Sequence, residues 1–233
     1  MALRPASPRA GLDSLHLPGR HLAEPGPIAG YEAEAASLIA PYDALAPEAV
    51  LGPVLDLLPR RPCRILDVGA GTGRDAAWLA ERGHEVVAAE PVAAFRAAAA
   101  ALHPHPGLGF VDDRLPDLER LVGSGARFEF VLLVGVWQHL RPGEHAAALG
   151  ALAKLTMPGG RLLLSLRHGP GAAGRACFPT APERVVSLAA PKGLELVARR
   201  AAPSLQPVNR AAGVTWTWLC FDKGADPSGR RRG

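Results

Sequence analysis

Short apolar runs alternate with segments of helical periodicity along most of the chain after residue 62. The runs have the length of buried strands, and the segments between them repeat apolar residues at the spacing of an amphipathic helix. Strands that alternate with helices pair in parallel through right-handed crossovers, which predicts a doubly wound α/β sheet with helices on both faces. The predicted strands are Cys63–Val68, Glu85–Glu90, Gly109–Val111, Phe128–Val134, Gly160–Leu166 and Leu194–Arg199, and the predicted helices are Thr72–Arg82, Val92–Leu102, Leu115–Val122, Gly143–Leu155 and Pro182–Ala190.

The segment VTWTWLCF, Val214–Phe221, breaks this rhythm. It alternates threonine with tryptophan, which is the period of a strand, and it follows the strand Leu194–Arg199 with no helical pattern between them. Two strands without a crossover helix pair in antiparallel fashion, so we expect a hairpin at this end of the sheet. Residues 223–233 are predicted to form a disordered basic tail.

The N-terminal part of the chain shows no sustained period. Residues 1–30 are rich in proline, glycine and arginine, which predicts a flexible arm. Further on, short helical pieces are expected to break at Pro41, Pro47 and Pro53, because a helix tolerates proline in its first turn but not in its middle. We therefore predict one domain over residues 31–222, made of a helical lid at 31–61 and an α/β core at 62–222.

Composition and charge exclude several classes of protein. A chain of 233 residues with 48% hydrophobic residues can fill one sizeable core. The three cysteines have no metal-binding or disulfide spacing, so we expect no metal site and a reducing, cytoplasmic location. No apolar stretch reaches the ~20 residues of a membrane span. The net charge of +4 comes in good part from short clusters of arginine and is a weak sign of nucleic-acid binding.

The most specific motif is ILDVGAGTGRDAAWLAERGHEVVAAE, which starts at residue 65. A strand, a glycine-rich turn and a helix N-terminus form the first unit of a doubly wound fold, whose ligands bind beyond the carboxyl ends of the strands. Gly69, Gly71 and Gly73 permit positive φ angles and a close approach of a ligand to the backbone. Thr72 and Asp75 have the spacing of a capping box, which predicts a well-defined start of the helix.

Two classes of cofactor compete for this loop. Gly71, Gly73 and Ala76 satisfy the pattern G-x-G-x-x-A of dinucleotide-binding proteins. Asp67, however, ends the first strand where a dinucleotide would bring its pyrophosphate, and like charges 4 Å apart at an effective dielectric near 20 repel by about 4 kcal/mol. Its carboxylate suits S-adenosylmethionine, which has a sulfonium, an ammonium and no phosphate. Glu90, after the second strand, can accept hydrogen bonds from a ribose diol of either cofactor.

The quoted motif, with the proline that follows it, resembles the first two motifs of class I S-adenosylmethionine-dependent methyltransferases. The resemblance continues through FVDDRLPDL, FEFVLLVGVWQHL and MPGGRLLLSLRHGP and covers most of Arg64–Pro170. It implies a Rossmann-like sheet of seven mostly parallel strands whose last strand is antiparallel, and S-adenosyl-L-methionine as the cofactor. The cofactor-binding residues that it implies are Asp67, Gly69 and Gly71 at the methionine end, Ala70 and Gly73 in the same loop, Glu90 at the ribose, Asp112 or Asp113 at the adenine amino group, and Val136 with Trp137 beside the adenine and the methyl donor.

Two histidines lie where a methyl acceptor would bind. Methyl transfer depends mainly on alignment of the acceptor, because the transferred carbon is already activated. His139 follows the fourth predicted strand and His168 the fifth, both at the carboxyl edge of the sheet. Each is a candidate base for a hydroxyl or ammonium acceptor, and each also has a plain alternative role as a hydrogen-bonding loop residue.

Other residues are candidates for contact with the acceptor itself. Arg167, with Arg175 and Arg210 further along, could hold a carboxylate or phosphate group, although a solvated surface position suits any one of them. Tyr31 and Tyr42 belong to the predicted lid, and we expect them to close over the site.

We predict a small-molecule acceptor. The sequence GVWQ after the fourth strand differs from the Pro-Pro-aromatic signature of enzymes that methylate base amines, and Pro62–Cys63 lies at the wrong edge of the sheet for the nucleophile of cytosine C5 enzymes. Three alternatives stay open: a non-catalytic cofactor-binding or assembly protein of the same fold, a nucleic-acid methyltransferase, and a nicotinamide-dependent oxidoreductase. The sequence does not identify the reacting atom of the acceptor or the oligomeric state.

Overall fold

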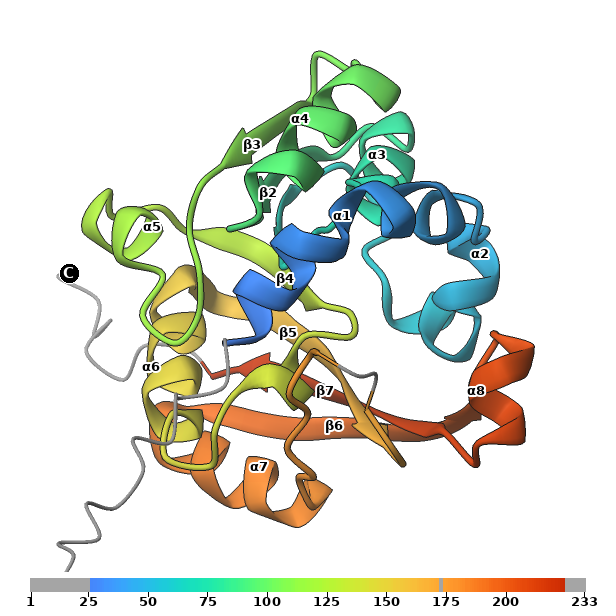
Figure 1. Cartoon of the computed structure of the whole chain (residues 1–233). Helices are drawn as coiled ribbons and strands as arrows, with labels where there is room; N and C mark the ends of the chain where they lie inside the picture. The colour runs from blue at the N-terminus through green and yellow to red at the C-terminus, as the bar shows by residue number, and fades with distance from the viewer. Residues whose placement is uncertain (1–25, 172–173, 225–233) are drawn as a thin grey trace, which may run out of the picture.

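The computed structural model describes residues 26–171 and 174–224. Within these ranges seven strands form a sheet in the order β3-β2-β1-β4-β5-β7-β6 (Figure 1). β7 is antiparallel to both of its neighbours and the other pairs are parallel, which confirms the predicted architecture. The strands are β1 (Arg64–Val68), β2 (Glu85–Ala89), β3 (Leu108–Val111), β4 (Phe128–Leu133), β5 (Thr156–His168), β6 (Leu194–Pro203) and β7 (Thr215–Lys223).

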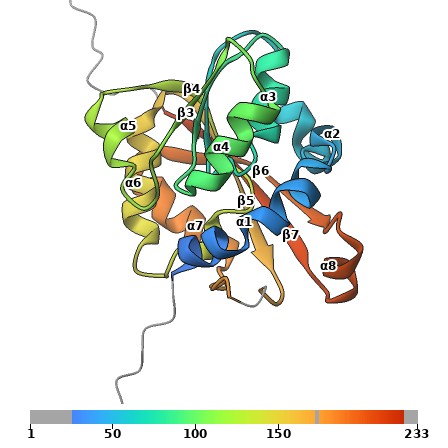
Figure 2. The same ribbon diagram turned by 45° about the horizontal axis from the view of Figure 1, so that its top comes forward.

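Helices pack on both faces of the sheet and over its carboxyl edge (Figures 1 and 2). The α-helices are α1 (Pro27–Asp43), α2 (Pro47–Val50), α3 (Arg74–Glu81), α4 (Ala93–Leu102), α5 (Glu119–Gly123), α6 (His145–Leu155), α7 (Pro182–Ala189) and α8 (Pro207–Ala211), and the 3₁₀ helices are η1 (Gly52–Leu57), η2 (Trp137–His139) and η3 (Ala190–Lys192).

Two hydrophobic clusters occupy the two faces of the sheet. Leu66 and Val68 of β1 point to a cluster that α5, α6 and α7 complete. Ile65 points to the other face, where α3 and η1 supply the apolar side chains. The alternation follows from the period of two along a strand, and it places Asp67 on the α3 side of the sheet. The first predicted strand is therefore buried on both sides, as a central parallel strand should be.

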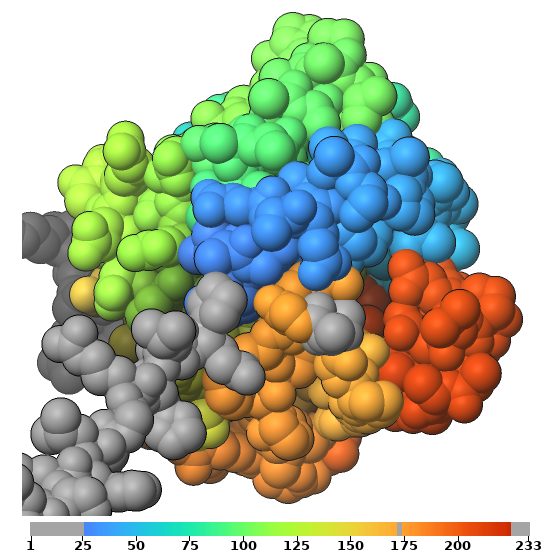
Figure 3. Space-filling model, viewed as in Figure 1, coloured from blue at the N-terminus to red at the C-terminus, as the bar shows by residue number. Residues whose placement is uncertain are grey.

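The first helix lies across the carboxyl edge of the sheet. Ala35 of α1 packs with Val92 and Phe95 at the start of α4, and the ring of Tyr31 lies 6.0 Å from the ring of Phe95. In Figure 3, α1 (blue) lies between the green residues of α4 and the orange residues that follow β5. The segment that the sequence assigned to a lid is therefore placed against the ligand-binding edge.

Two predictions for this helix were wrong: its start and the break expected at Pro41. α1 begins at Pro27, four residues before the predicted boundary, and proline suits this first position because its fixed φ is already helical. The helix also continues through Pro41 to Asp43. Pro41 lies in the last turn, so its missing N–H removes one bond near a helix end that is frayed in any case. Pro47 begins α2 as expected.

Three other elements differ from the sequence prediction. The predicted helix Leu115–Val122 forms only as α5, because Leu118 adopts a left-handed φ of 47° and Pro116 disfavours helix at the residue before it. The five-residue α8 between β6 and β7 is too short to show a helical period. β5 extends beyond Gly160–Leu166 at both ends: Thr156 pairs with Phe128 of β4 at its start, and β7 pairs with it as far as His168 at its end.

No helix in the described part of the chain combines the length and the apolar character needed to cross a bilayer.

Candidate active site

The loop after β1 presents its backbone at the carboxyl edge of the sheet. Gly69, Gly71 and Gly73 have φ values of 72°, 58° and 75°, in the left-handed region that favours glycine. A Cβ atom on Gly69 would lie 2.4 Å from Cγ2 of Val136 in the loop after β4, whereas one on Gly71 would meet no atom within 4 Å. The loop is therefore packed against Val136 at Gly69, whereas the space beside Gly71 is open to a ligand.

A first cavity of about 220 Å³ lies beside this loop. Its walls come from the loops after β1, β2, β3 and β4 and from α1. Of the residues predicted to bind the cofactor, Asp67, Gly69, Ala70, Gly71, Glu90, Asp113 and Val136 line this cavity.

Two buried carboxyl groups border the first cavity. Asp67 is 2% exposed, and burial, followed by the nearby carboxylate of Asp75, raises its pKa well above the usual value. Burial also raises the pKa of Glu90, although its carboxylate accepts hydrogen bonds from the N–H groups of Gly71 and Val92, each at 2.8 Å. A cation or a hydroxyl donor beside such groups stabilises their charged form. Both groups thus fit the ammonium and ribose diol of S-adenosylmethionine.

The structure distinguishes the two adjacent aspartates after β3. Asp113 is buried and lines the first cavity, and its carboxylate accepts hydrogen bonds from the N–H groups of Arg114 and Leu121, each at 2.9 Å. Asp112 is on the surface, where its carboxylate pairs with Arg96 at 3.0 Å. Asp113 is therefore the one placed to meet an adenine, and the alternative residue Asp112 is not.

Two predicted cofactor residues lie away from the cavity. Trp137 is fully buried because η2 turns it into the core, where its ring lies 4.9 Å from that of His145. Gly73 caps α3, and a Cβ there would approach Ala99 to 3.0 Å and Phe110 to 3.1 Å. Neither residue lines the first cavity, because Gly73 serves the packing of α3 and Trp137 that of the core, and their contact with the cofactor stays a prediction.

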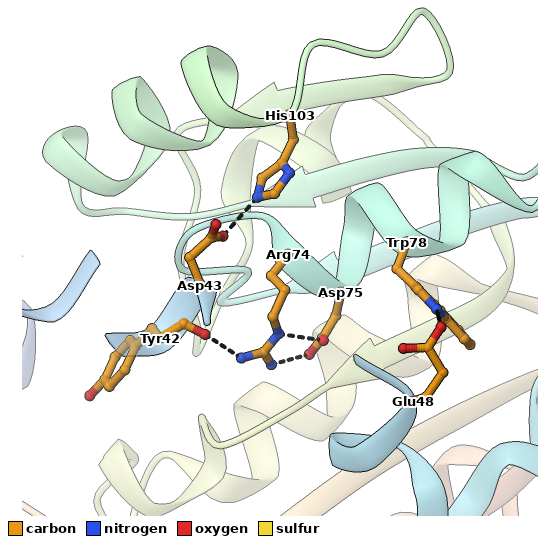
Figure 4. A network of polar contacts seen from close by, with 7 residues as sticks. All are labelled: Tyr42, Asp43, Glu48, Arg74, Asp75, Trp78 and His103. Carbon is orange, nitrogen blue, oxygen red and sulfur yellow. Dashed lines mark hydrogen bonds and ion pairs between the residues drawn. The ribbon is translucent and has the colours of Figure 1, made fainter. Parts of the chain in front are cut away.

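The predicted capping box is also wrong. Gly73 is the N-cap of α3, and no side chain caps this helix. The carboxylate of Asp75 instead accepts two hydrogen bonds from Arg74, at 2.8 and 2.9 Å, and Nη1 of Arg74 donates to the carbonyl oxygen of Tyr42 at 2.7 Å (Figure 4). Arg74 therefore joins the glycine loop to α1, a role that the sequence analysis missed although the residue directly follows the loop.

A second cavity, of about 540 Å³, adjoins the first. Its wall comes from residues of the segment from α1 to η1, from the carboxyl-edge halves of β5, β6 and β7 with α8, and from the loops after β4 and β5. The residues that border both cavities are Tyr31, Tyr42, Arg74, Val134, Gly135 and His139.

His139 is held at this boundary by three hydrogen-bond contacts, one of which comes from the side-chain amide nitrogen of Gln138, 3.2 Å from Nε2 of His139. Its Nδ1 lies 2.8 Å from the carbonyl oxygen of Ala176, which only accepts, so Nδ1 carries the proton and Nε2 has a free lone pair. The hydroxyl of Tyr31 lies 3.0 Å from Nε2 and donates to it. Burial lowers the pKa of His139, which keeps the ring neutral. This arrangement can accept a proton at Nε2.

The other candidate base lies on the wrong face of the sheet. β5 extends to His168, and successive side chains of a strand point to opposite faces. Arg167 consequently lines the second cavity, whereas Nε2 of His168 lies 2.9 Å from Oγ1 of Thr217 and borders neither cavity. The structure therefore gives no support to the candidate roles of His168 as base or substrate contact. Arg175 lines the second cavity and Arg210 does not.

Further polar contacts, of Asp43 and Glu48, fasten the segment of α1 and α2 to the α/β core, and Figure 4 shows those with His103 and Trp78. Oδ1 of Asp43 lies 2.7 Å from Nε2 of His103 at the end of α4. The carboxylate of Glu48 accepts from the indole N–H of Trp78 and pairs with Arg82 at 3.0 Å. His103, directly after α4, therefore connects the first helix to the core.

Comparison with known proteins decides the family. A family model described as a methyltransferase domain matches residues 42–218, which include the glycine loop, the carboxyl groups of Asp67 and Glu90 and the first part of β7. The chain belongs to the class I S-adenosylmethionine-dependent methyltransferases. Because this family uses S-adenosylmethionine, the match also confirms the cofactor that the sequence predicted.

Curated methyltransferases are similar over part of their length. An uncharacterized methyltransferase of Mycobacterium bovis is 32% identical over 113 residues, which are 46% of this chain and 40% of that protein. A ubiquinone biosynthesis O-methyltransferase of Cereibacter sphaeroides is 29% identical over 180 residues, 71% of each chain. This chain thus spans less than half the length of the mycobacterial relative.

Solved structures share the methyltransferase fold at low sequence identity. A TehB-like methyltransferase from Corynebacterium glutamicum has a TM-score of 0.58 and 23% identity, over 84% of this chain and 97% of that one. A 1,6-didemethyltoxoflavin-N1-methyltransferase from Burkholderia thailandensis, solved with 1,6-didemethyltoxoflavin and S-adenosylhomocysteine bound, has a TM-score of 0.61 and 21% identity, over 84% and 88%.

Two tryptophans line the second cavity although the sequence analysis assigned them no functional role. Trp216 and Trp218 line the second cavity from β7. Their alternation with Thr215 and Thr217 places both on one face of a strand, but the sequence does not show which face borders the ligand.

Proposed function

We propose that this methyltransferase transfers the methyl group of S-adenosylmethionine to a small-molecule acceptor, with the cofactor in the first cavity and the acceptor in the second. The observation that carries the proposal is the shared boundary, where Gly135 and His139 border both cavities. Two ligands bound side by side there would meet at a half-buried histidine. The proteins named above as ubiquinone and toxoflavin methyltransferases support a small acceptor by analogy alone.

The first cavity has groups suited to each part of the cofactor. When bound, S-adenosylmethionine supplies a methyl group that its sulfonium already activates for displacement. Asp67 would hold the ammonium group, Glu90 the ribose diol and Asp113 the adenine amino group. Val136 would offer an apolar contact, and it is fixed in place by the glycine loop.

His139 would act as the general base. Its tautomer is fixed because Nδ1–H donates to the carbonyl of Ala176, and Nε2 accepts at the boundary of the cavities. A hydroxyl or ammonium of the acceptor that replaces the hydroxyl of Tyr31 at Nε2 would give its proton to the ring. A positioned base of this kind contributes about 10² to 10⁴ in rate.

Residues 31–61 would serve as the lid of the site. Tyr31 and Tyr42 border both cavities, and Leu38 and Leu45 border the second. The contacts of Asp43 with the core are polar and partly exposed, so they can open without loss of the hydrophobic core.

Calorimetric titration with S-adenosylmethionine, S-adenosylhomocysteine and NADH tests this proposal. We expect micromolar binding of the first two and no binding of NADH, with loss of binding in Asp67→Ala and Gly71→Val variants that remain folded. Binding of NADH alone would favour an oxidoreductase instead. Cofactor binding without methylation of any compound in a broad screen of small hydroxyl and amine acceptors would favour the non-catalytic alternative.

A further inference from the structure

The second cavity carries an excess of positive charge. Its described lining residues include the three arginines Arg74, Arg167 and Arg175 but no aspartate or glutamate. The charge of Arg74 is balanced by Asp75, whose carboxylate it contacts at 2.8 Å. The charges of the other two arginines decide what the cavity can hold.

Arg167 has only neutral partners among the residues that the structure describes. Its Nη1 donates to the carbonyl oxygen of Gly169 at 3.3 Å and to that of Pro170, and its Nη2 donates to Oδ1 of Asn209 at 3.4 Å. No carboxylate in residues 26–171 or 174–224 forms an ion pair with it. Its guanidinium is therefore available to an anion in the cavity.

Arg175 is nearly buried and only partly neutralised. Its side chain is 11% exposed, and Nη2 lies 3.5 Å from a carboxylate oxygen of Glu34, which is outside the cavity. Nη1 donates to the hydroxyl of Tyr42 at 3.1 Å, and the guanidinium carbon lies 5.1 Å from the centre of the Tyr31 ring. Both tyrosines border the boundary between the cavities, so the charge of Arg175 acts where the acceptor would react.

Most of the remaining side chains that line the cavity are apolar or aromatic, and its other polar side chains are uncharged residues such as Gln138, Ser165 and Gln206. Arg167 is paired in register with Trp216 across β5 and β7, and Ser165 is paired with Trp218. Cη2 of Trp216 lies 3.7 Å from the position of a Cβ atom on Gly135. Apolar side chains of the lid segment complete the wall: Leu38, Pro41, Leu45, Ala49, Val50 and Pro53.

From this lining we infer that the methyl acceptor is an anion with a flat apolar body, whose carboxylate or phosphate group binds Arg167 and Arg175 while its body packs on Trp216. An unbalanced guanidinium in a partly desolvated cavity favours a bidentate oxyanion, and indole rings favour planar apolar groups. The inference rests on the proposed function, because it assigns the second cavity to the acceptor.

Three naphthalene probes of matched shape test the charge preference: 2-naphthoate, 2-naphthyl phosphate and the neutral 2-naphthamide. Each is titrated by calorimetry into the protein with and without S-adenosylhomocysteine. A charge-assisted contact corresponds to a preference of at least about tenfold, so one of the two anions should bind at least about tenfold more tightly than the amide. Tighter binding of the phosphate than of the carboxylate would identify a phosphate ester as the acceptor class, and the reverse order a carboxylic acid.

Arginine variants show whether the preference arises in the cavity. Arg167→Gln should reduce it, and Arg167→Gln combined with Arg175→Gln should abolish it, whereas Arg167→Lys should retain most of it. The matched control is Arg199→Gln, which removes a surface arginine paired with Glu183 at 2.7 Å and outside both cavities. Melting temperatures of all variants confirm that each is folded.

Equal or tighter binding of the amide by the wild-type protein, or absence of binding by both anions, would overturn the inference. An anion preference that persists in the double variant would also overturn it. Failure of S-adenosylhomocysteine to bind would instead count against the proposed function. Because the probes are also titrated without that ligand, the two failures can be told apart.

Discussion

The hydroxyl of Tyr31 donates a hydrogen bond to Nε2 of His139 over 3.0 Å, and the two rings meet edge to face with centroids 5.3 Å apart. One residue belongs to α1 and the other to η2 after β4, so the contact joins the lid segment to the carboxyl edge of the sheet. It also occupies the only nitrogen of His139 that can accept a proton. The lid and the candidate base are therefore linked by one contact.

Replacement of His139 by glutamine should lower kcat by about 10² to 10⁴ with a hydroxyl acceptor, because the variant keeps a polar side chain but loses the base. Its affinity for S-adenosylhomocysteine should stay within about twofold of wild type, since a base acts on the acceptor. The matched control is His168→Gln, which changes a histidine that borders neither cavity and should retain activity. Equal loss of activity in both variants would contradict the assignment of the base.

The pH dependence of kcat/KM should show one acid limb from His139. Burial lowers its pKa below the usual 6.5, so the ring is neutral and able to accept a proton throughout the range above that pH. Activity should be level above pH 6.5 and should fall only on further acidification. The kcat/KM of the residual activity of His139→Gln should show no such decrease at acid pH. An apparent pKa above 6.5 that is absent from this variant would show that the ring is protonated more readily than its burial predicts.

Asp67→Asn should make the cofactor-free protein more stable while it weakens cofactor binding. The pKa of Asp67 is raised by burial, so its contribution to stability is fully present below the unfolded value of 3.8 and is lost as pH rises through the folded value. At pH 7.5 asparagine removes this penalty, and the free energy of unfolding should rise by about 1 kcal/mol or more.

Denaturant titration of the two proteins measures the change, and calorimetry measures the affinity for S-adenosylmethionine. Asp112→Asn is the control, because Asp112 is at the surface and outside both cavities. It should change neither quantity by more than a few tenths of a kcal/mol. A wild-type protein more stable at pH 7.5 than Asp67→Asn would show that the carboxylate is stabilised in the absence of ligand.

Loss of the contact between Asp43 and His103 should loosen the lid. The pair is partly buried at 2.7 Å, and its removal in Asp43→Ala should lower the local stability of α1 by about 1 kcal/mol. Amide hydrogen exchange in residues 27–43 should become about fivefold faster, with little change in the strands. Glu183→Ala breaks a surface pair of the same length with Arg199 and should leave this exchange unaltered.

The sheet could be predicted because its signals are local. The apolar run of β1 and the helical period of α3 are visible in the residues themselves, and parallel pairing follows from their alternation. The end of β5 is not local, because pairing with β7 from the other end of the chain carries the strand to His168. The sequence analysis therefore placed His168 after the strand, whereas it is the last residue of β5 and lines neither cavity.

Part of the candidate site could also be predicted, because some of its residues lie at the ends of strands that are visible in the sequence. Asp67 and Glu90 follow directly from strand ends, and the structure brings both to one cavity. Trp137 was predicted to lie beside the cofactor, but the chain enters η2 shortly after β4 and this residue is buried in the core. No hydrophobic pattern in the sequence indicates such a short helix. Arg175, whose position depends on the packing of the long segment after β5 against α1, could be proposed only as one of several arginines.

The position of α1 would set the order of events in the proposed catalytic cycle. Tyr31 and Tyr42 of this helix border both cavities, so one displacement of α1 as the proposed lid would uncover both together. The methylated product and the spent cofactor would then leave through the same opening, and neither would be exchanged while the other is enclosed. When methyl transfer is faster than this displacement, the turnover number reports the motion of a helix and not the making of a bond.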